Sequence, residues 1–160
     1  MRFGAVKECW SVAWALGQAE LKAYDEPCES EAVAMCIGWL NQRSDTVLEN
    51  PTLRPRSEIE GWTNTYLTVH WRLRQHRLAP SGHGPRQIDL ADYVASAKWG
   101  PLTVANIALI DSDLSIGGTR IDPAAEDTFE QTCSIVRERH KALNWLRGDA
   151  PLYSAVRTPT

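Results

Sequence analysis

The residues best suited to chemistry lie near the C-terminal end of the chain, in the sequence ERHKALNWL. Within it, Glu138, Arg139, His140 and Asn144 stand among apolar residues. A histidine can act as a general base near neutral pH, and an arginine can hold an anion. At helical spacing, Arg139 and His140 lie on two different apolar faces, one formed by Ile135, Ala142 and Leu146 and the other by Phe129, Cys133, Val136 and Leu143.

These polar side chains allow two interpretations. A buried Arg139 requires a carboxylate or several carbonyl groups, because an unpaired charge in the interior is costly. Glu138 points elsewhere on the same helix, so other segments should supply the partner; the candidates are His70, Arg72, Asp111 and Asp113. The first interpretation is a satisfied network that fixes helix packing. The second is a cleft in which His140 acts as a base and Arg139 binds an anion.

The sequence does not complete a catalytic set around these residues. Serine, cysteine and histidine are present, but no local motif links them as nucleophile and base. The patterns of the nucleophile elbow, the P-loop and the dinucleotide fold are absent, and Gly117-Gly118 is typical of a turn. The cysteines lack the ligand spacing of a zinc site; they are Cys9, Cys28, Cys36 and Cys133. We therefore favour the network and expect reduced, buried cysteines, no metal and no cofactor.

The composition is that of an ordinary globular domain. The chain has 160 residues, of which 43% are hydrophobic and 23% charged, so it is long enough to bury a core as one domain. Its formal net charge of −3 disfavours nucleic-acid binding. No apolar stretch approaches the roughly 20 residues of a membrane span, and the first residues do not form a secretory signal. These features predict a soluble, cytosolic protein.

The apolar periodicity predicts a mainly α, single-domain helical bundle with one short β-hairpin. Residues 1–150 would form the domain and residues 151–160 a C-terminal tail. We expect helices over residues 6–24, 30–41, 57–76 and 90–97, and a last helix from after Pro123 to Arg147, stopped by Gly148. The hairpin would pair Leu114–Ile116 with Thr119–Ile121 across Gly117-Gly118.

Two of these helices carry the strongest signals. Residues 57–76 repeat apolar side chains at a period of 3.6, and Ser57 with Glu60 matches a capping box. The last helix is apolar over most of its circumference, which is typical of a central helix. Its polar residues are therefore expected in the interior.

Tryptophan is unusually frequent, with seven residues against two phenylalanines. Trp14, Trp62 and Trp145 lie on apolar stripes and are expected in the core. Trp10 lies on the outermost turn of the first helix, with little chain before it to cover that face. We expect it either under the C-terminal tail or at an interface for self-association or a protein partner, because aromatic residues are enriched at such sites.

Three segments resemble a known family: WSVAWALG at residues 10–17, LRPRSEIEGWTNTYLTVHWRLR at residues 53–74, and VRERHKALNWL at residues 136–146. The family is the bacterial one called domain of unknown function 4272, and residues 156–160 are similar to its ending. The resemblance spans nearly the whole chain. It implies a helical fold and brings no established activity, ligand or catalytic residue.

The expected function is that of a non-catalytic intracellular protein acting through protein–protein contacts, as an immunity protein or a regulator does. The missing catalytic set and the face of Trp10 support it. The alternative is an enzyme or small-molecule binder with a pocket at Glu138, Arg139 and His140, joined by His70 and Arg72. A deep pocket there would favour the alternative, whereas a sealed network and an exposed apolar patch near Trp10 would favour protein contacts.

Overall fold

The computed structural model describes residues 4–37, 52–82 and 85–160. The structure is 53% helical, with a small three-stranded antiparallel sheet. The α-helices in these ranges are α1 (Gly4–Ala15), α2 (Ser30–Ile37), α4 (Arg56–Leu78), α5 (Leu90–Ser96) and α6 (Glu126–Arg147). None of them is both long and apolar enough to cross a bilayer. The expected mainly α fold is confirmed, and its arrangement as a bundle stays a prediction.

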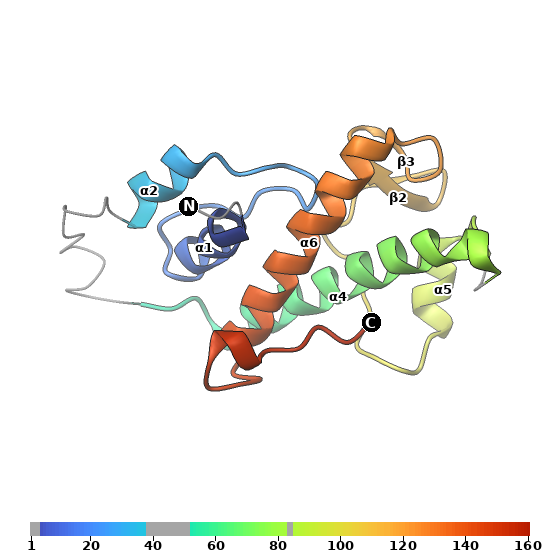
Figure 1. The fold of residues 1–160 in the computed structure, drawn as a ribbon. Helices are drawn as coiled ribbons and strands as arrows, with labels where there is room; N and C mark the ends of the chain where they lie inside the picture. The colour runs from blue at the N-terminus through green and yellow to red at the C-terminus, as the bar shows by residue number, and fades with distance from the viewer. Residues whose placement is uncertain (1–3, 38–51, 83–84) are drawn as a thin grey trace.

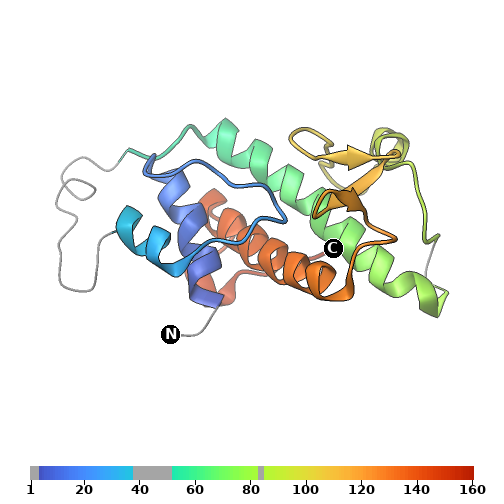
Figure 2. The same cartoon turned by 90° about the horizontal axis from the view of Figure 1, so that it is seen from above.

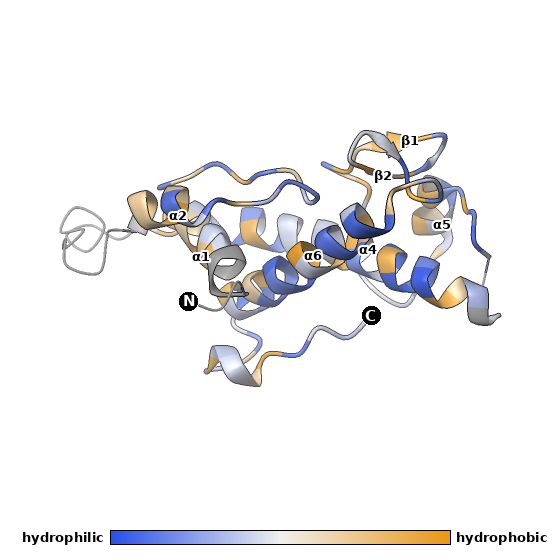
Figure 3. Ribbon diagram, turned by 45° about the horizontal axis from the view of Figure 1, so that its top comes forward, coloured by the Kyte–Doolittle hydropathy of each residue, from blue (hydrophilic) through white to orange (hydrophobic). Residues whose placement is uncertain are grey.

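Helix α6 lies at the centre of the molecule. It packs most extensively on α4 and next on α1, as Figures 1 and 2 show from two directions. Ile135, Val136 and Leu143 of α6 are fully buried in these contacts. Figure 3 shows that hydrophilic residues also follow α6 along its length. The prediction of a central helix with polar residues in the interior is therefore confirmed.

The first helix is shorter than expected, because it ends at Ala15 and not at Tyr24. Gly17 adopts a φ of +71°, the left-handed region that terminates helices, and the Gln18 N–H donates to Ala13 O over 2.8 Å. The prediction of a helix continuing through Gly17 to residue 24 was wrong. Residues 18–29 instead follow an irregular path across α6 (Figure 2).

The other helix boundaries differ in smaller ways. Helix α4 starts at Arg56 after Pro55, so the expected capping box is not formed, and Glu60 pairs with Arg56 at 2.8 Å instead. Helix α6 starts at Glu126 and not directly after Pro123. Its end at Gly148, with a φ of +97°, is confirmed. Residues 38–41 of the expected second helix lie outside the described residues.

The sheet has one strand more than the expected hairpin. Strands β2 (Asp113–Ile116) and β3 (Thr119–Arg120) pair antiparallel across Gly117-Gly118, whose φ values of +57° and +78° fit the predicted tight turn. Strand β1 (Leu109–Ile110) pairs with the other edge of β2. The turn between β1 and β2 is built from Asp111 and Ser112, both with positive φ.

A buried ion pair ties β2 to α4. The Arg72 guanidinium donates to both carboxylate oxygens of Asp113, from Nε over 2.8 Å and from Nη2 over 2.5 Å. Nη2 also donates to Arg86 O, and Asp113 Oδ1 accepts from the Leu114 N–H. Because Asp113 is engaged here, it is not the partner of Arg139. Arg72, a candidate site residue, therefore joins α4 to β2 through its ion pair with Asp113.

We predict that Asp113→Ala destabilises the protein by about 3–5 kcal/mol, because it leaves the buried Arg72 charge without its counter-ion. Urea unfolding followed by circular dichroism measures this loss. Glu130→Ala is the matched control, since Glu130 forms an exposed ion pair with Arg77, and its loss should cost about 1 kcal/mol or less. Equal effects of the two substitutions would contradict the assignment of Asp113.

Candidate functional site

Arg139 is enclosed by the irregular segment that follows α1. Its guanidinium, which is 0% exposed, donates from Nη1 to Ala23 O over 2.7 Å and from Nη2 to Glu26 O over 2.8 Å. Nη1 also contacts the Tyr66 hydroxyl at 3.2 Å, and Nη2 the Cys28 thiol sulfur at 2.9 Å. Arg139 is therefore buried and bonded to other segments, as expected, and carbonyl groups take the place of a carboxylate.

Glu138 does not join Arg139 in a cleft. Its carboxylate pairs with Arg137 Nε at 3.1 Å, on the same helix. Neither Glu138 nor Arg139 is among the residues that line the pocket at His140 or the three smaller pockets described around α4. The hypothesis of a pocket formed by Glu138, Arg139 and His140 therefore gains support from the described pockets only at His140.

His140 instead contacts His70 of α4. The two Nδ1 atoms are 3.0 Å apart, and the ring planes are perpendicular. Burial lowers the pKa of His140 to about 3 and that of His70 to about 4, and the nearby cations Arg74 and Arg137 add to the lowering at His70. Both rings are therefore neutral at pH 7.

A hydrogen bond between two Nδ1 atoms fixes how the two rings share their protons. One ring must carry its proton on Nδ1 and donate, and the other must carry it on Nε2 and accept. Whichever ring donates then has an acceptor at Nε2, and the other has a donor there. The two histidines form a polar pair whose tautomers depend on each other.

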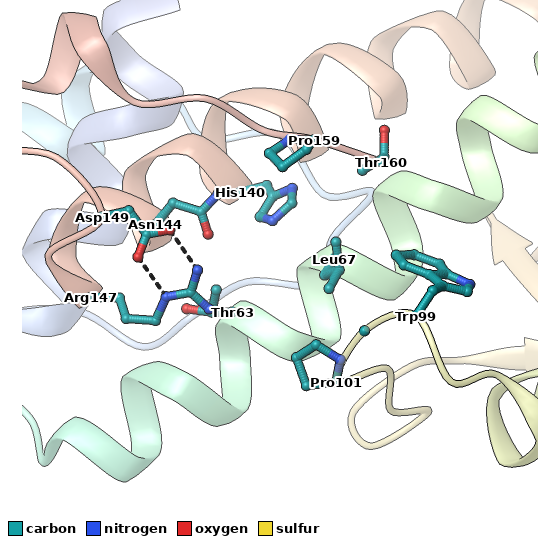
Figure 4. A pocket seen from close by; sticks show the side chains of 11 residues that line it. Thr63, Leu67, Trp99, Pro101, His140, Asn144, Arg147, Asp149, Pro159 and Thr160 are labelled. Atoms are coloured by element: carbon teal, nitrogen blue, oxygen red, sulfur yellow. Dashed lines mark hydrogen bonds and ion pairs between the residues drawn. The ribbon is translucent and has the colours of Figure 1, made fainter.

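His140 lies at one wall of a pocket between α4 and α6, which we call the α4–α6 pocket. Its volume is about 400 Å³. Four parts of the chain line it: α4, the C-terminal half of α6 with Asp149, the segment at residues 99–101, and the tail at residues 159–160 (Figure 4). The lining residues are Thr63, Leu67, Trp99, Gly100, Pro101, His140, Asn144, Arg147, Asp149, Pro159 and Thr160.

Asn144 places an unpartnered acceptor at this pocket. Its side chain is 3% exposed and points toward the pocket beside His140 (Figure 4). Nδ2 donates to Arg157 O over 3.1 Å, which fixes the orientation of the amide, since a carbonyl cannot donate to Oδ1. Within residues 4–37, 52–82 and 85–160, no group donates to Asn144 Oδ1.

The rim of the pocket combines an ion pair with an aromatic ring. Arg147 donates to both carboxylate oxygens of Asp149, over 2.9 Å from Nε and 2.5 Å from Nη2. Trp99 is 49% exposed, and its Nε1 donates to the Tyr93 hydroxyl over 3.0 Å. Tyr93 in turn stacks on Trp71, with ring centroids 4.1 Å apart. Trp99 is thus held in place although half of its surface is open.

The structure brings together only part of the predicted site. His140 and Asn144 line the α4–α6 pocket and His70 contacts His140, whereas the other candidates of the C-terminal helix and α4 lie elsewhere. Sequence reasoning missed Trp99, Arg147 and Asp149, which form the rim. Trp99-Gly100-Pro101 was a signal that could have been used, because a tryptophan before a Gly-Pro pair marks an aromatic side chain on a loop.

Trp10 is buried, and the expectation that it forms an exposed interface is wrong. The ring is 8% exposed. Its Nε1 donates to Glu20 O over 2.9 Å, and Lys22 Nζ lies 5.5 Å from the ring centroid. The cover comes from the segment after α1, which the sequence analysis had assigned to the helix itself.

No disulfide joins the four cysteines, and each is half-buried and not fully buried as expected; they are Cys9, Cys28, Cys36 and Cys133. Within the ranges that the structure describes, no group of three or more histidine, cysteine or acidic side chains is arranged to hold a metal ion. Within those same ranges, no third side chain of these types joins His70 and His140.

The chain was compared with protein families, curated proteins and solved structures. No family model, no curated protein and no solved structure matches the chain. The resemblance to domain of unknown function 4272 stays a prediction, and the function has to be argued from the geometry of the site.

We predict that Arg139→Ala costs about 3 kcal/mol or more, because it leaves at least two buried carbonyl groups without a donor. Thermal unfolding should then show a Tm lower by roughly 6–12 °C. Arg137→Ala, on the exposed side of the same helix, is the control and should change the Tm by about 2 °C or less. If the Tm of Arg139→Ala equals that of the wild type, the guanidinium is not enclosed.

The histidine pair predicts how stability depends on pH. In the unfolded chain both rings have a pKa near 6.5, whereas in the native state they stay neutral to about pH 4. The unfolded state therefore binds more protons below pH 6.5, and the free energy of unfolding should fall as the pH drops from 6.5 to 4. The slope from the pair is at most about 2.7 kcal/mol per pH unit.

Urea unfolding between pH 7.5 and pH 4.5 measures this slope. The double variant His70→Gln, His140→Gln should lose the contribution of the pair and keep that of the remaining groups. An NMR titration in which either native ring gains a proton above pH 6 would contradict the prediction.

Proposed function

We propose that the protein binds a small molecule in the α4–α6 pocket. The observation that carries this proposal is the Oδ1 atom of Asn144, a buried acceptor that faces the pocket and receives no hydrogen bond from the described residues. Leaving a buried polar atom unpaired costs about 1–3 kcal/mol, so such an atom in a native protein calls for an explanation. A ligand that donates a hydrogen bond to Asn144 Oδ1 would explain why this atom is unpaired within the protein.

The shape and lining of the pocket support the same proposal. Its volume of about 400 Å³ lies within the range of small-molecule sites. Such sites combine apolar walls with a few polar groups that fix the orientation of the ligand. Leu67, Pro101 and Pro159 supply apolar surface here, and His140 and Asn144 supply the polar groups.

The expectation of protein–protein contacts rested partly on an open face at Trp10. That ring is covered, and among the residues that the structure describes the exposed aromatic side chain suited to a partner is Trp99, at the rim of the pocket. A protein partner therefore stays a prediction, and the pocket is the stronger basis for a function.

A metabolite library screened by thermal shift tests the proposal. A pocket ligand at a hundredfold excess over its Kd should stabilise the protein by about 2.7 kcal/mol and raise the Tm by roughly 5–10 °C. Leu67→Trp fills the pocket and should abolish this shift. Leu152→Trp is the matched control, because Leu152 is exposed and lies away from the lining, and it should bind as the wild type does.

Two results would contradict the proposal. One is a library in which no compound raises the Tm. The other is a set of ligands that stabilise Leu67→Trp and the wild type equally, which would place their site outside the pocket.

A further inference from the structure

We infer that the ligand of the α4–α6 pocket is an uncharged compound with a flat apolar body and an amide-like edge, in which an N–H lies next to a carbonyl oxygen or a ring nitrogen. This inference rests on the proposed function and names the class of ligand. A different group of the pocket determines each part of the ligand.

The N–H follows from Asn144. With Nδ2 held by Arg157 O, the amide cannot turn over without placing its carbonyl oxygen against another carbonyl oxygen. Only Oδ1 then faces the ligand, and a carboxamide oxygen can only accept. A ligand group at this position must therefore be a donor.

The second polar atom of the edge follows from His140. It precedes Asn144 by four residues on α6, so the two side chains lie on the same face of the helix. Its Nδ1 is engaged with His70, which leaves Nε2 for the ligand. Because the histidine pair can exchange its tautomers, Nε2 can donate to a carbonyl oxygen or a ring nitrogen beside the N–H.

The absence of charge follows from the ionised groups at the pocket. Among the side chains of the described lining residues, Arg147 is the cation and Asp149 the anion, and each is engaged by the other through two hydrogen bonds. His140 stays neutral because burial lowers its pKa to about 3. A charged ligand would lose water without meeting an unengaged counter-ion, which is costly.

The flat body follows from the apolar side of the lining. Leu67 and Pro101 lie on one part of the wall and Pro159 on another, with the indole of Trp99 at the rim (Figure 4). The indole is held by Tyr93, so it offers a fixed surface on which an aromatic ring can stack.

Three matched probes test the inference on the wild-type protein: benzamide, N,N-dimethylbenzamide and benzoate. Benzamide has the required edge, the dimethyl compound lacks the N–H, and benzoate carries a negative charge. We expect benzamide to bind with a Kd on the order of 1 mM, as suits a small fragment. The other two should bind about tenfold more weakly or worse, since each leaves Asn144 Oδ1 without a donor.

Two-dimensional NMR titration, with the Trp99 indole N–H as reporter, measures the three Kd values. Leu67→Trp and Leu152→Trp, titrated with benzamide, separate the pocket from the rest of the surface. Because the main comparison is between ligands on one protein, it does not depend on the folding of a variant.

The outcomes separate this inference from the proposed function. If benzoate or the dimethyl compound binds as tightly as benzamide, and Leu67→Trp abolishes the binding, the inference is overturned and the pocket remains a ligand site. Failure of benzamide to bind at about 10 mM, tenfold above the expected Kd, also overturns the inference. In that case pocket-dependent hits from the metabolite screen would leave the proposed function standing. If all binding survives in Leu67→Trp, both fail.

Discussion

The enclosure of Arg139 by backbone carbonyl groups is the interaction on which the arrangement of the molecule depends. The segment that encloses it has no regular structure, so its carbonyl groups need a donor from elsewhere, and the buried guanidinium needs acceptors. The guanidinium supplies donors to the carbonyl groups, and the carbonyl groups supply acceptors to the guanidinium. The same segment reaches the sheet, where the Tyr24 hydroxyl donates to Ala108 O and Ser115 O and the Asp25 carboxylate accepts from the Gly117 N–H. One irregular stretch thus holds α6 and the sheet together.

Helix α6 separates two kinds of polar chemistry that the sequence places side by side. Consecutive residues on an α-helix point about 100° apart, so Arg139 and His140 face different neighbours. Arg139 faces the segment after α1, whose carbonyl groups accept its hydrogen bonds. His140 faces α4 and the pocket, one turn before Asn144. Adjacency in sequence suggested a single site, and helical geometry divides it into one part that holds the fold together and one part that faces the pocket.

The periodic part of the fold could be predicted from the sequence, and the irregular part could not. The apolar stripes of α4 and α6 and the turn at Gly117-Gly118 are local patterns, and local patterns can be read from the chain. The first helix was predicted to run through Gly17, because the spacing of apolar residues does not reveal that this glycine ends the helix. Strand β1 was missed because Asp111 and Ser112 form its turn without a glycine. The pocket walls come from segments far apart in sequence, and only packing brings them together.

The ten residues after the predicted domain boundary at residue 150 are part of the architecture of the pocket. Val156 is buried, Arg157 supplies a carbonyl to Asn144, and Pro159 and Thr160 form one wall. A chain cut at residue 150 would keep both long helices and lose that carbonyl. The Asn144 amide could then rotate by half a turn at little cost and present either end to the pocket. The tail therefore determines the hydrogen-bonding character of the pocket, because the Arg157 carbonyl fixes whether the oxygen or the nitrogen of the Asn144 amide faces it.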